Sequence, residues 1–436
     1  MTEYIINENL ILEELCNGKI ILRNFNTNKF HLLNKTAAYI LKNLDKSTSE
    51  LSRLIFENLS NNINISITEI EEDIKLTFED FINKGLIKPS NLVTKNNLKY
   101  AKVRNLYLEI ISLCNKQCLY CYNKENISKY EIIDVKNIEE IIKQCDPKIL
   151  EGIILSGGEP FLYENIEEIF ILCKKYNLKV AMVSNGSLID NKKAKMLSKY
   201  NINIQFTIDG YNAELNNLTR GKNSFESQIS ALELLRKNNF KGFLNIRTNL
   251  WSKNLSYKNI KGIVEICEKF EVLRLDLVEA KKNGSFNEIL LESDYKKVKS
   301  IIDKLNTKVN IVYERDIEEF KCELDKDLKN IEFGLRISAN GDVFPCQYFL
   351  DKQFSIGNIY HNTLEEIIYG DKNKKIIDLI SIRKSFIKKC TDCVYGDKCN
   401  AGCPAKAYLN NNNIFTTDGS CYKRKLDFAN YYIKLI

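Results

Sequence analysis

The pattern of apolar and polar residues divides the chain into three regions of different character. Over residues 1–90, three short alternating segments, "LILEEL", "KIILRNF" and "KFHLLN", precede a stretch with helical periodicity. This order predicts a small α+β unit in which strands come before helices. The polar stretch that follows, at 91–103, has neither periodicity and is predicted to be a linker.

Two capping-box spacings predict where helices of this first unit begin. Ser47 is followed three residues later by Glu50, and Thr68 is followed by Glu71. The second helix is predicted to end at Gly85. Its apolar face is predicted from residues that recur every four positions: Ile70, Ile74, Phe78 and Ile82.

Between residues 104 and 305, apolar strand-like segments alternate with helical patterns. Six such strands are predicted: "NLYLEIISL", "GIILSG", "KVAMVSNG", "NIQFTIDG", "FLNIRTNL" and "VLRLDLV". Six βα units favour an α/β fold in which a parallel sheet curls into a partial (β/α)6 barrel. In folds of this kind the chemistry lies at the carboxyl ends of the strands.

Composition narrows the classes of function. The 436 residues carry a net charge of +7 without a dense basic block, so nucleic acid is not an expected partner. The chain lacks a run of 18 apolar residues and starts with polar sequence, so neither a membrane span nor a secretory signal is expected. We therefore expect a cytoplasmic protein, in which fourteen cysteines are better candidates for metal ligands than for disulfides. With only two histidines, a His-based zinc site or a Ser/His/Asp triad is not expected.

Three cysteines stand directly after the first predicted barrel strand. Cys114, Cys118 and Cys121 have the spacing C-x3-C-x2-C, with Tyr120 immediately before the last. Three thiolates can hold three irons of a cubane cluster and leave one iron open to a small molecule. A zinc knuckle or three reduced core thiols are the alternatives.

This motif resembles that of the radical S-adenosylmethionine (SAM) superfamily. The resemblance implies a [4Fe-4S] cluster whose open iron chelates SAM and, when reduced, cleaves it to methionine and a 5′-deoxyadenosyl radical. "SGGEP" resembles the family's glycine-rich loop, with Gly157 and Gly158 near the methionine end of SAM and Glu159 near its amino group. The resemblance also implies that Tyr120 lies near the adenine.

Further strand ends resemble the same family. "SNG", with Ser184 and Asn185, and "TIDG", with Asp209, match segments that approach the ribose and the reaction zone. We take Asp209 as the candidate catalytic proton acceptor. Arg220 is a candidate for the SAM carboxylate, with a surface arginine as the alternative.

The C-terminal region, 306–436, contains seven cysteines. Their pattern resembles the SPASM domain of radical SAM peptide maturases, which carries two auxiliary iron–sulfur clusters, here expected to be [4Fe-4S]. The resemblance implies that the first cluster is held by Cys322, Cys346 and Cys403. It implies that the second is held by Cys390, Cys393, Cys399 and Cys421.

Some cysteine assignments stay open at this point. Two closed cubane clusters need eight ligands, and the pattern supplies seven cysteines. The first auxiliary cluster therefore has an open iron or a ligand from another residue. By itself, C-x2-C-x5-C-x3-C would also suit a structural zinc ribbon. Four further cysteines lie in helical or strand patterns and are predicted to be buried apolar thiols: Cys16, Cys145, Cys173 and Cys267.

The first unit resembles the recognition element of enzymes that modify ribosomally made peptides (RiPPs), a winged-helix-like α+β domain. That resemblance implies that a precursor's leader peptide binds as an added strand at about Lys29–Asn34, facing the helix Thr68–Asn83. A DNA-binding winged helix is the alternative. About 10 Lys/Arg against about 13 Asp/Glu in this segment argue against phosphate binding.

Together these features predict a radical SAM enzyme that modifies a precursor peptide, most simply by forming Cys thioether crosslinks of the sactipeptide or ranthipeptide type. Flavodoxin or ferredoxin is the expected reductant. Carbon–carbon crosslinking, epimerisation and sulfatase-maturase-like formylglycine formation are the alternatives on the same scaffold. A non-catalytic peptide- or zinc-binding protein is the alternative outside enzymes.

Overall fold

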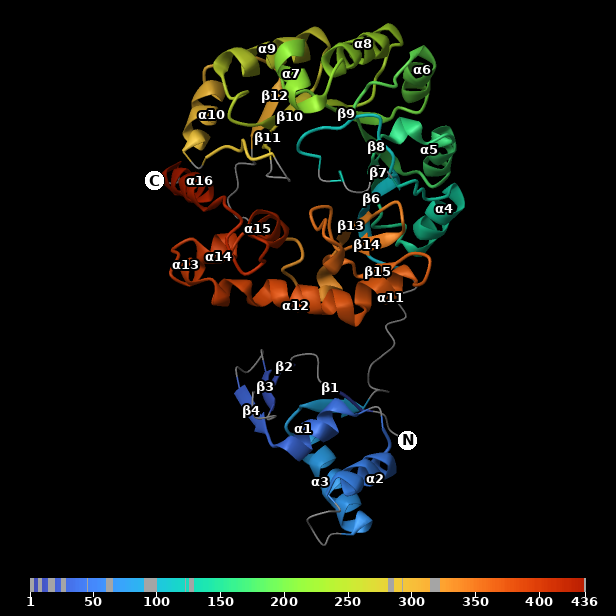
Figure 1. Cartoon of the computed structure of the whole chain (residues 1–436), viewed down its shortest axis with the longest axis vertical. Helices are drawn as coiled ribbons and strands as arrows, with labels where there is room; N and C mark the ends of the chain where they lie inside the picture. Colours follow the sequence, from blue (N-terminus) through green and yellow to red (C-terminus); the bar gives the residue numbers. More distant parts are fainter. Residues whose placement is uncertain are drawn as a thin grey trace. The chain divides into compact units, whose positions relative to one another are not determined.

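The computed structural model divides into two compact units, Met1–Leu98 and Lys99–Ile436, and each is described by itself (Figure 1). The boundary falls inside the predicted linker. The structure describes residues 4–6, 10–14, 20–24, 29–44, 46–59, 66–89, 100–121, 123–124, 129–280, 286–291, 293–313 and 322–434. Among these residues, no helix has both the length and the apolar character that a membrane crossing requires.

The first unit contains a three-stranded antiparallel sheet in the order β2-β3-β4. Its strands are β2 (Leu10–Glu14), β3 (Ile20–Asn24) and β4 (Lys29–Leu33). Three helices follow: α1 (Lys35–Lys42), α2 (Thr48–Leu59) and α3 (Ile67–Asn83). The predicted order of strands before helices is confirmed. A second pair, β1 (Tyr4–Ile6) with β5 (Ile87–Pro89), was not predicted, because each strand is only three residues long.

One of the two predicted helix starts is correct. Ser47 and Glu50 exchange the reciprocal hydrogen bonds of a capping box at the start of α2. The prediction of Thr68 with Glu71 was wrong, because Ser66 caps α3 and pairs with Glu69. Thr68 already lies inside the first turn of that helix.

The buried face of α3 differs from its prediction at one position. Ile70, Ile74 and Phe78 are buried as expected, but Ile82 is 39% exposed and Phe81 takes its place in the core. The reason is helical geometry: a spacing of exactly four residues drifts from the 3.6-residue turn, so the face returns to i+11 rather than i+12.

The second unit is built on six parallel strands that match the six predicted ones. They are β6 (Val103–Ile111), β7 (Gly152–Gly157), β8 (Lys179–Ser184), β9 (Asn203–Thr207), β10 (Leu244–Leu250) and β11 (Arg274–Glu279). They are adjacent in sequence order. The α/β fold class is therefore confirmed as a curved parallel sheet of the partial-barrel type.

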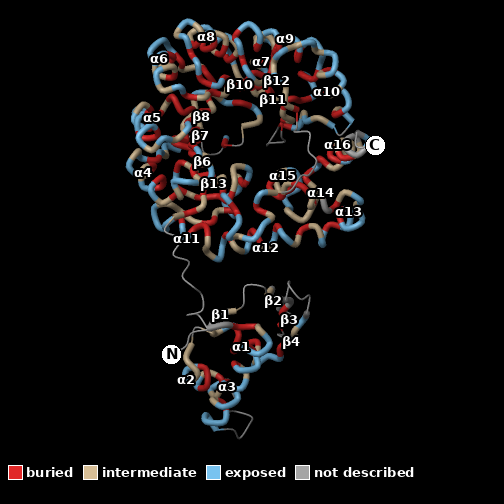
Figure 2. Tube along the Cα trace, turned by 180° about the vertical axis from the view of Figure 1, so that it is seen from behind, coloured by how far each residue is buried: buried red, intermediate tan, exposed pale blue. Residues whose placement is uncertain are grey.

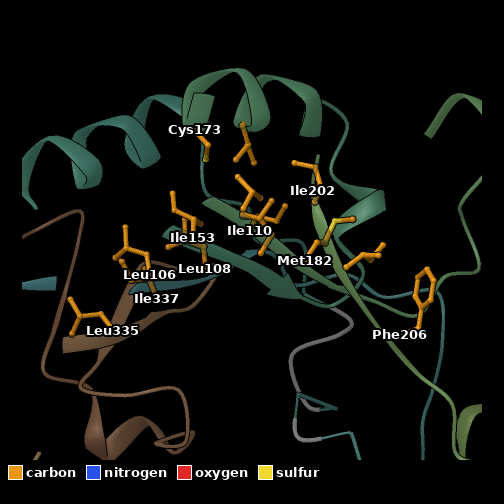
Figure 3. Close-up of a cluster of buried hydrophobic side chains, with 14 of the residues drawn as sticks. Leu106, Leu108, Ile110, Ile153, Cys173, Met182, Ile202, Phe206, Leu335 and Ile337 are labelled. Atoms are coloured by element: carbon orange, nitrogen blue, oxygen red, sulfur yellow. The ribbon is translucent and has the colours of Figure 1, made fainter. Parts of the chain in front are cut away.

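The connecting helices lie outside the curved sheet (Figure 1). They are α4 (Val135–Gln144), α5 (Ile166–Lys175), α6 (Asn191–Lys199), α7 (Ala213–Arg220), α8 (Ser224–Lys237), α9 (Tyr257–Lys269) and α10 (Asp294–Ile302). Buried residues follow the strands and the inner sides of these helices (Figure 2). Figure 3 shows one part of this core, where Cys173 of α5 points toward strands that carry Ile153 and Ile110.

The sheet extends beyond the six predicted strands at both edges, to ten strands in all within the described residues. β12 (Asn310–Tyr313) pairs in parallel with β11, and β13 (Phe333–Ile337) pairs in parallel with β6. β14 (Asp342–Phe344) and β15 (Gly357–Asn358) follow as antiparallel strands. The C-terminal region is thus joined to the barrel through its sheet.

The remaining C-terminal elements are helical. They are α11 (Leu364–Tyr369), α12 (Asp371–Phe386), α13 (Lys388–Thr391), α14 (Gly396–Cys399), α15 (Pro404–Asn411) and α16 (Cys421–Lys434). Four of the seven C-terminal cysteines lie within or at the start of these helices: Cys390, Cys399, Cys403 and Cys421.

Candidate active site and iron–sulfur sites

The three cysteines of C-x3-C-x2-C lie on the loop that leaves the carboxyl end of β6. Burial is the main reason that the pKa of the Cys114 thiol is raised to about 11, and the charges of Glu159, Cys118 and Cys121 contribute in the same direction. The three sulfur atoms are therefore near enough to interact electrostatically. Cys118 is buried, whereas Cys114 and Cys121 are partly exposed.

The glycine-rich turn after β7 packs directly against this loop. Gly157 has φ of +123°, and a Cβ there would lie 2.2 Å from the carbonyl oxygen of Ile111. A Cβ on Gly158 would lie 1.9 Å from the carbonyl oxygen of Leu113. The backbone N–H of Glu159 donates to that same oxygen at 2.8 Å. Only glycine permits this approach, so the two glycines fix the turn to the residue that precedes Cys114.

Glu159 connects this turn to the carboxyl end of β8. Its buried carboxylate accepts hydrogen bonds from Ser184 Oγ at 2.8 Å and from the Asn185 backbone N–H at 2.8 Å. Burial raises the pKa of the Glu159 carboxyl, although these hydrogen bonds act in the opposite direction. The Asn185 side-chain amide in turn approaches Cys114 Sγ at 3.9 Å. Three predicted strand ends thus meet at the cysteine loop.

Tyr120, Asp209 and Arg220 form a second group beside the cysteines. The Tyr120 hydroxyl donates to Asp209 Oδ2, and Arg220 Nη1 donates to the Tyr120 oxygen at 3.5 Å. Burial acts to lower the pKa of the Arg220 guanidinium, but neighbouring Tyr120 and Cys118 more than offset this and hold it above its usual range. Arg220 is half-buried, with its Nε fully buried, which argues against the alternative of a surface arginine.

The Asp209 carboxylate is fully buried and accepts three hydrogen bonds. Besides Tyr120, Thr219 Oγ1 donates at 2.8 Å and the Asn249 backbone N–H donates at 2.9 Å. Such saturation is typical of a group that positions its neighbours. Asp209 as a proton acceptor stays a prediction, and its geometry favours a positioning role toward Tyr120.

Sequence reasoning missed several polar residues that hold the Asp209 segment. Asn216 Oδ1 accepts from the Asp209 backbone N–H at 2.9 Å. The side chains of Asn254 and Asn259 donate to the Asp209 carbonyl oxygen at 2.9 and 3.1 Å. All three asparagines are fully buried. Their signal was hidden by the high asparagine content of the chain, since a buried asparagine looks like any other in the sequence.

An aromatic cluster at the ends of β10 and β11 was also missed. Trp251 and Phe286 make an edge contact at 6.0 Å, and Phe286 contacts Tyr120 at 5.7 Å between ring centroids. Trp251 is only 3% exposed, and its Nε1 has no hydrogen-bond partner among the described residues. The Arg220 Nε is likewise buried without a partner in the described part of the chain. Two unused donors thus lie beside the cysteine loop, which fits the binding of a polar cofactor such as SAM.

The seven C-terminal cysteines fall into two groups. Burial is the main reason that the pKa of the Cys322 thiol is raised, and charge on Cys403 or Cys346 adds to the effect. These three form one group, which matches the first predicted ligand set and includes Cys322 despite its distance in sequence. Asp325 also acts on the Cys322 thiol.

The second group matches the second predicted ligand set. Burial raises the pKa of the Cys390 thiol, and Cys421, Cys399 and Cys393 each add to the shift. A pocket is lined by the same four cysteines and by Arg424. The structure therefore brings together the three-plus-four arrangement that the sequence pattern implied.

The spacing of these thiols bears on the zinc alternatives. Among the described residues, no three His, Cys, Asp or Glu side chains are close enough together to hold a single metal ion. A tetrahedral zinc ion requires four sulfur atoms about 2.3 Å from one centre.

Three of the other cysteines are buried in the core as predicted. Cys145 is 2% exposed, and Cys173 and Cys267 are 0% exposed. Burial raises the pKa of each of these thiols to about 12. They are inert apolar side chains. Cys16 lies outside the described residues.

Two family models match the chain. Residues 108–250 match the radical SAM superfamily, and residues 330–394 match SPASM, an iron–sulfur cluster-binding domain. The chain therefore contains a radical SAM domain followed by a SPASM domain. This defines its class: an enzyme that uses SAM and iron–sulfur clusters as cofactors.

Relatives of this class match at low identity. The chain is 27% identical to the antilisterial bacteriocin subtilosin biosynthesis protein AlbA of Bacillus subtilis, over 99% of this chain and 94% of AlbA. It is 28% identical to a cysteine-type anaerobic sulfatase-maturating enzyme of Clostridium perfringens, over 66% of this chain and 85% of that enzyme.

Solved structures share the fold. SuiB of Streptococcus suis bound to S-adenosylmethionine superposes with a TM-score of 0.58 at 18% identity, over 95% of this chain and 98% of SuiB. The anSMEcpe structure with bound AdoMet gives a TM-score of 0.60 at 21% identity, over 76% of this chain and 97% of that one.

Proposed function

We propose that this enzyme modifies a ribosomally made precursor peptide and forms a thioether from a substrate cysteine. The observation that carries a peptide substrate is the match to AlbA along 99% of the chain, since AlbA is a bacteriocin biosynthesis protein. SuiB, which covers 95% of the chain, has been solved bound to its precursor peptide SuiA. The reductant is flavodoxin or ferredoxin, and the location is cytoplasmic.

Cys114, Cys118 and Cys121 would hold the radical SAM cluster, whose chemistry is the reductive cleavage of SAM to a 5′-deoxyadenosyl radical. Glu159, held by Ser184 and Asn185, would lie near the SAM amino group. The unused Nε of Arg220 can donate to the SAM carboxylate. Tyr120, fixed by Asp209, would line the adenine side of the site.

The group of three C-terminal thiols is the basis for the thioether. Cys322, Cys346 and Cys403 would hold the first auxiliary cluster and leave one iron open. A substrate cysteine bound there would be deprotonated and held near the carbon radical, with an electron passing to the cluster as the carbon–sulfur bond forms. Asp325 is the competing fourth ligand, because its charge acts on the Cys322 thiol.

Mass spectrometry of the modified peptide tests the product. Each thioether is expected to remove two hydrogens, about 2 Da, and to protect one substrate cysteine from alkylation, because the sulfur is bonded to carbon. A loss of about 2 Da with every cysteine still alkylated would instead indicate a carbon–carbon crosslink. Asp325→Ala is the matched variant: it should keep the activity if the iron is open and lose the cluster if Asp325 is a ligand.

We propose that the first unit binds the leader of the precursor. Its edge strand β4 presents two large apolar side chains to solvent, Phe30 at 62% and Leu32 at 60% exposure. The other edge of β4 pairs with β3. A leader that adds as a further strand beside β4 would cover these side chains and gain backbone hydrogen bonds along the sheet.

Replacing Phe30 and Leu32 together by Asp is expected to weaken precursor binding about 100-fold, because two apolar contacts are lost and charge is buried. SAM cleavage without substrate should not change. Ile171→Asp is the control, a somewhat less exposed apolar residue of α5 at 53% exposure. Fluorescence anisotropy of a labelled leader measures the effect, and unchanged affinity in the double variant would exclude this surface.

Formylglycine formation is the second candidate, favoured by the match to the sulfatase-maturating enzyme. That match covers 66% of this chain, whereas the AlbA match covers 99%. Modification of a precursor peptide, the function suggested by the AlbA match, therefore accounts for more of the chain than formylglycine formation does. Epimerisation would be recognised by a product of unchanged mass.

A further inference from the structure

The loop between Cys399 and Cys403 joins the two groups of C-terminal thiols. Its three residues, Asn400, Ala401 and Gly402, all have positive φ, at 42°, 63° and 72°. Asparagine adopts such backbone readily, but it is strained for alanine and persists there only where the surroundings impose it. Because the two ends of the loop carry thiols of different groups, Cys399 of the second and Cys403 of the first, the shape of this loop sets the spacing of the two sites.

Arg383 of α12 holds this loop in place. Its side chain is 1% exposed, and its Nη1 donates to the carbonyl oxygen of Gly402 at 2.9 Å. Nε and Nη2 donate to the carbonyl oxygens of Ile414 and Thr416 at 2.6 and 3.0 Å. One guanidinium thus ties the strained loop to the segment that leads to Cys421.

Asp418 and Arg424 form a second set of contacts between the two groups of C-terminal thiols. Asp418 Oδ2 accepts from the Cys403 backbone N–H at 3.0 Å and from Arg424 Nη1 at 2.9 Å. The Arg424 side chain lines the same pocket as Cys399, and its positive charge acts to lower the pKa of the Cys399 thiol. The side chains of Asp418 and Arg424 are 0% and 6% exposed. A continuous path of contacts therefore runs from a ligand of one site to a ligand of the other.

Space around this ion pair is filled. A Cβ on Gly402 would lie 2.5 Å from Arg424 Nη2 and 2.7 Å from Asp418 Oδ2. Burying two guanidinium groups is costly unless negative charge compensates them. Backbone carbonyl oxygens compensate the Arg383 guanidinium, and Asp418 pairs with Arg424. The cysteines that line the same pocket as Arg424 would add negative charge as thiolates.

We propose that Arg383, Asp418 and Arg424 form a buried charged frame that fixes the spacing of the two auxiliary clusters, and that Arg424 raises the reduction potential of the second. The inference rests on the ligand assignment of the proposed function. A cationic donor beside a ligand sulfur stabilises the reduced cluster, which carries one more negative charge than the oxidised one. Arg424 is a positioning and tuning residue.

The test uses the full chain with Cys114, Cys118 and Cys121 changed to Ala, so that only auxiliary clusters give signals. Arg424→Gln removes the charge, and Arg424→Lys keeps it. Redox titration followed by electron paramagnetic resonance is expected to show one auxiliary potential shifted to lower values in Arg424→Gln and close to the parent in Arg424→Lys. Arg236→Gln, a half-buried arginine that binds the Phe270 carbonyl, should leave both potentials unchanged.

The outcomes separate this inference from the function on which it rests. Unshifted potentials in Arg424→Gln, or equal shifts in Arg424→Gln and Arg424→Lys, would overturn the tuning role. Loss of iron in Arg424→Gln with iron retained in Arg424→Lys would support a frame that depends on the charge of this residue. Loss of iron in both variants would show that only the shape of the arginine side chain matters, and would overturn the proposed role of its charge. A parent without auxiliary iron would refute the ligand assignment itself.

Discussion

Replacing Cys114, Cys118 and Cys121 together by Ala is expected to remove about a third of the iron and to abolish SAM cleavage, since one of three cubane clusters loses all its protein ligands. The two C-terminal thiol groups are made of other cysteines, so their iron should stay. The measurements are iron per chain after anaerobic reconstitution and 5′-deoxyadenosine formed after reduction.

The chain offers a matched control for this variant. Cys145, Cys173 and Cys267 are also three thiols in the same domain, but each is buried in the apolar core. Changing these three to Ala should leave the iron content and SAM cleavage as in the parent, although the core loses some stability. If the Cys114/Cys118/Cys121 variant still produces 5′-deoxyadenosine, the radical SAM assignment of this motif is wrong.

Much of the site could be predicted because local spacing carries its chemistry. The thiol spacing and the glycines after β7 are properties of short segments, and a parallel sheet brings the ends of successive strands together. The contacts of Glu159 with Ser184 and Asn185 follow from that topology. For the same reason the six strands could be located from their apolar runs.

The parts that could not be predicted depend on distant partners. β13 pairs with β6 although more than 200 residues separate them, and no local pattern indicates that pairing. The ionic contact of Arg336 with Glu109, 2.9 Å apart and buried between these two strands, was invisible for the same reason. The role of Asp209 was predicted from its place after a strand, whereas its hydrogen bonds with Thr219 and Asn249 depend on the fold.

Gly158→Ala is expected to lower the rate of SAM cleavage about 100-fold, because a displacement of about 1 Å near reacting groups has effects of that size. The new Cβ would lie 1.9 Å from the carbonyl oxygen of Leu113 and 2.5 Å from that of Ser112. Both neighbours are backbone atoms, so the turn and the cysteine loop must separate. That movement would break the hydrogen bond of the Glu159 N–H to Leu113 and shift Cys114.

The matched control is Gly334→Ala in β13. There the nearest atom to a new Cβ is Cε2 of the Tyr107 ring, at 3.3 Å, and a ring can shift where a backbone carbonyl cannot. Gly158→Ala should lower the free energy of unfolding by about 1–3 kcal/mol through overpacking, and Gly334→Ala by less. Auxiliary iron should be the same in both variants, which confines the loss to the SAM site. Parent-like SAM cleavage in Gly158→Ala would mean that the turn after β7 moves without disturbing the cysteine loop, and the close backbone contact would then have no catalytic consequence.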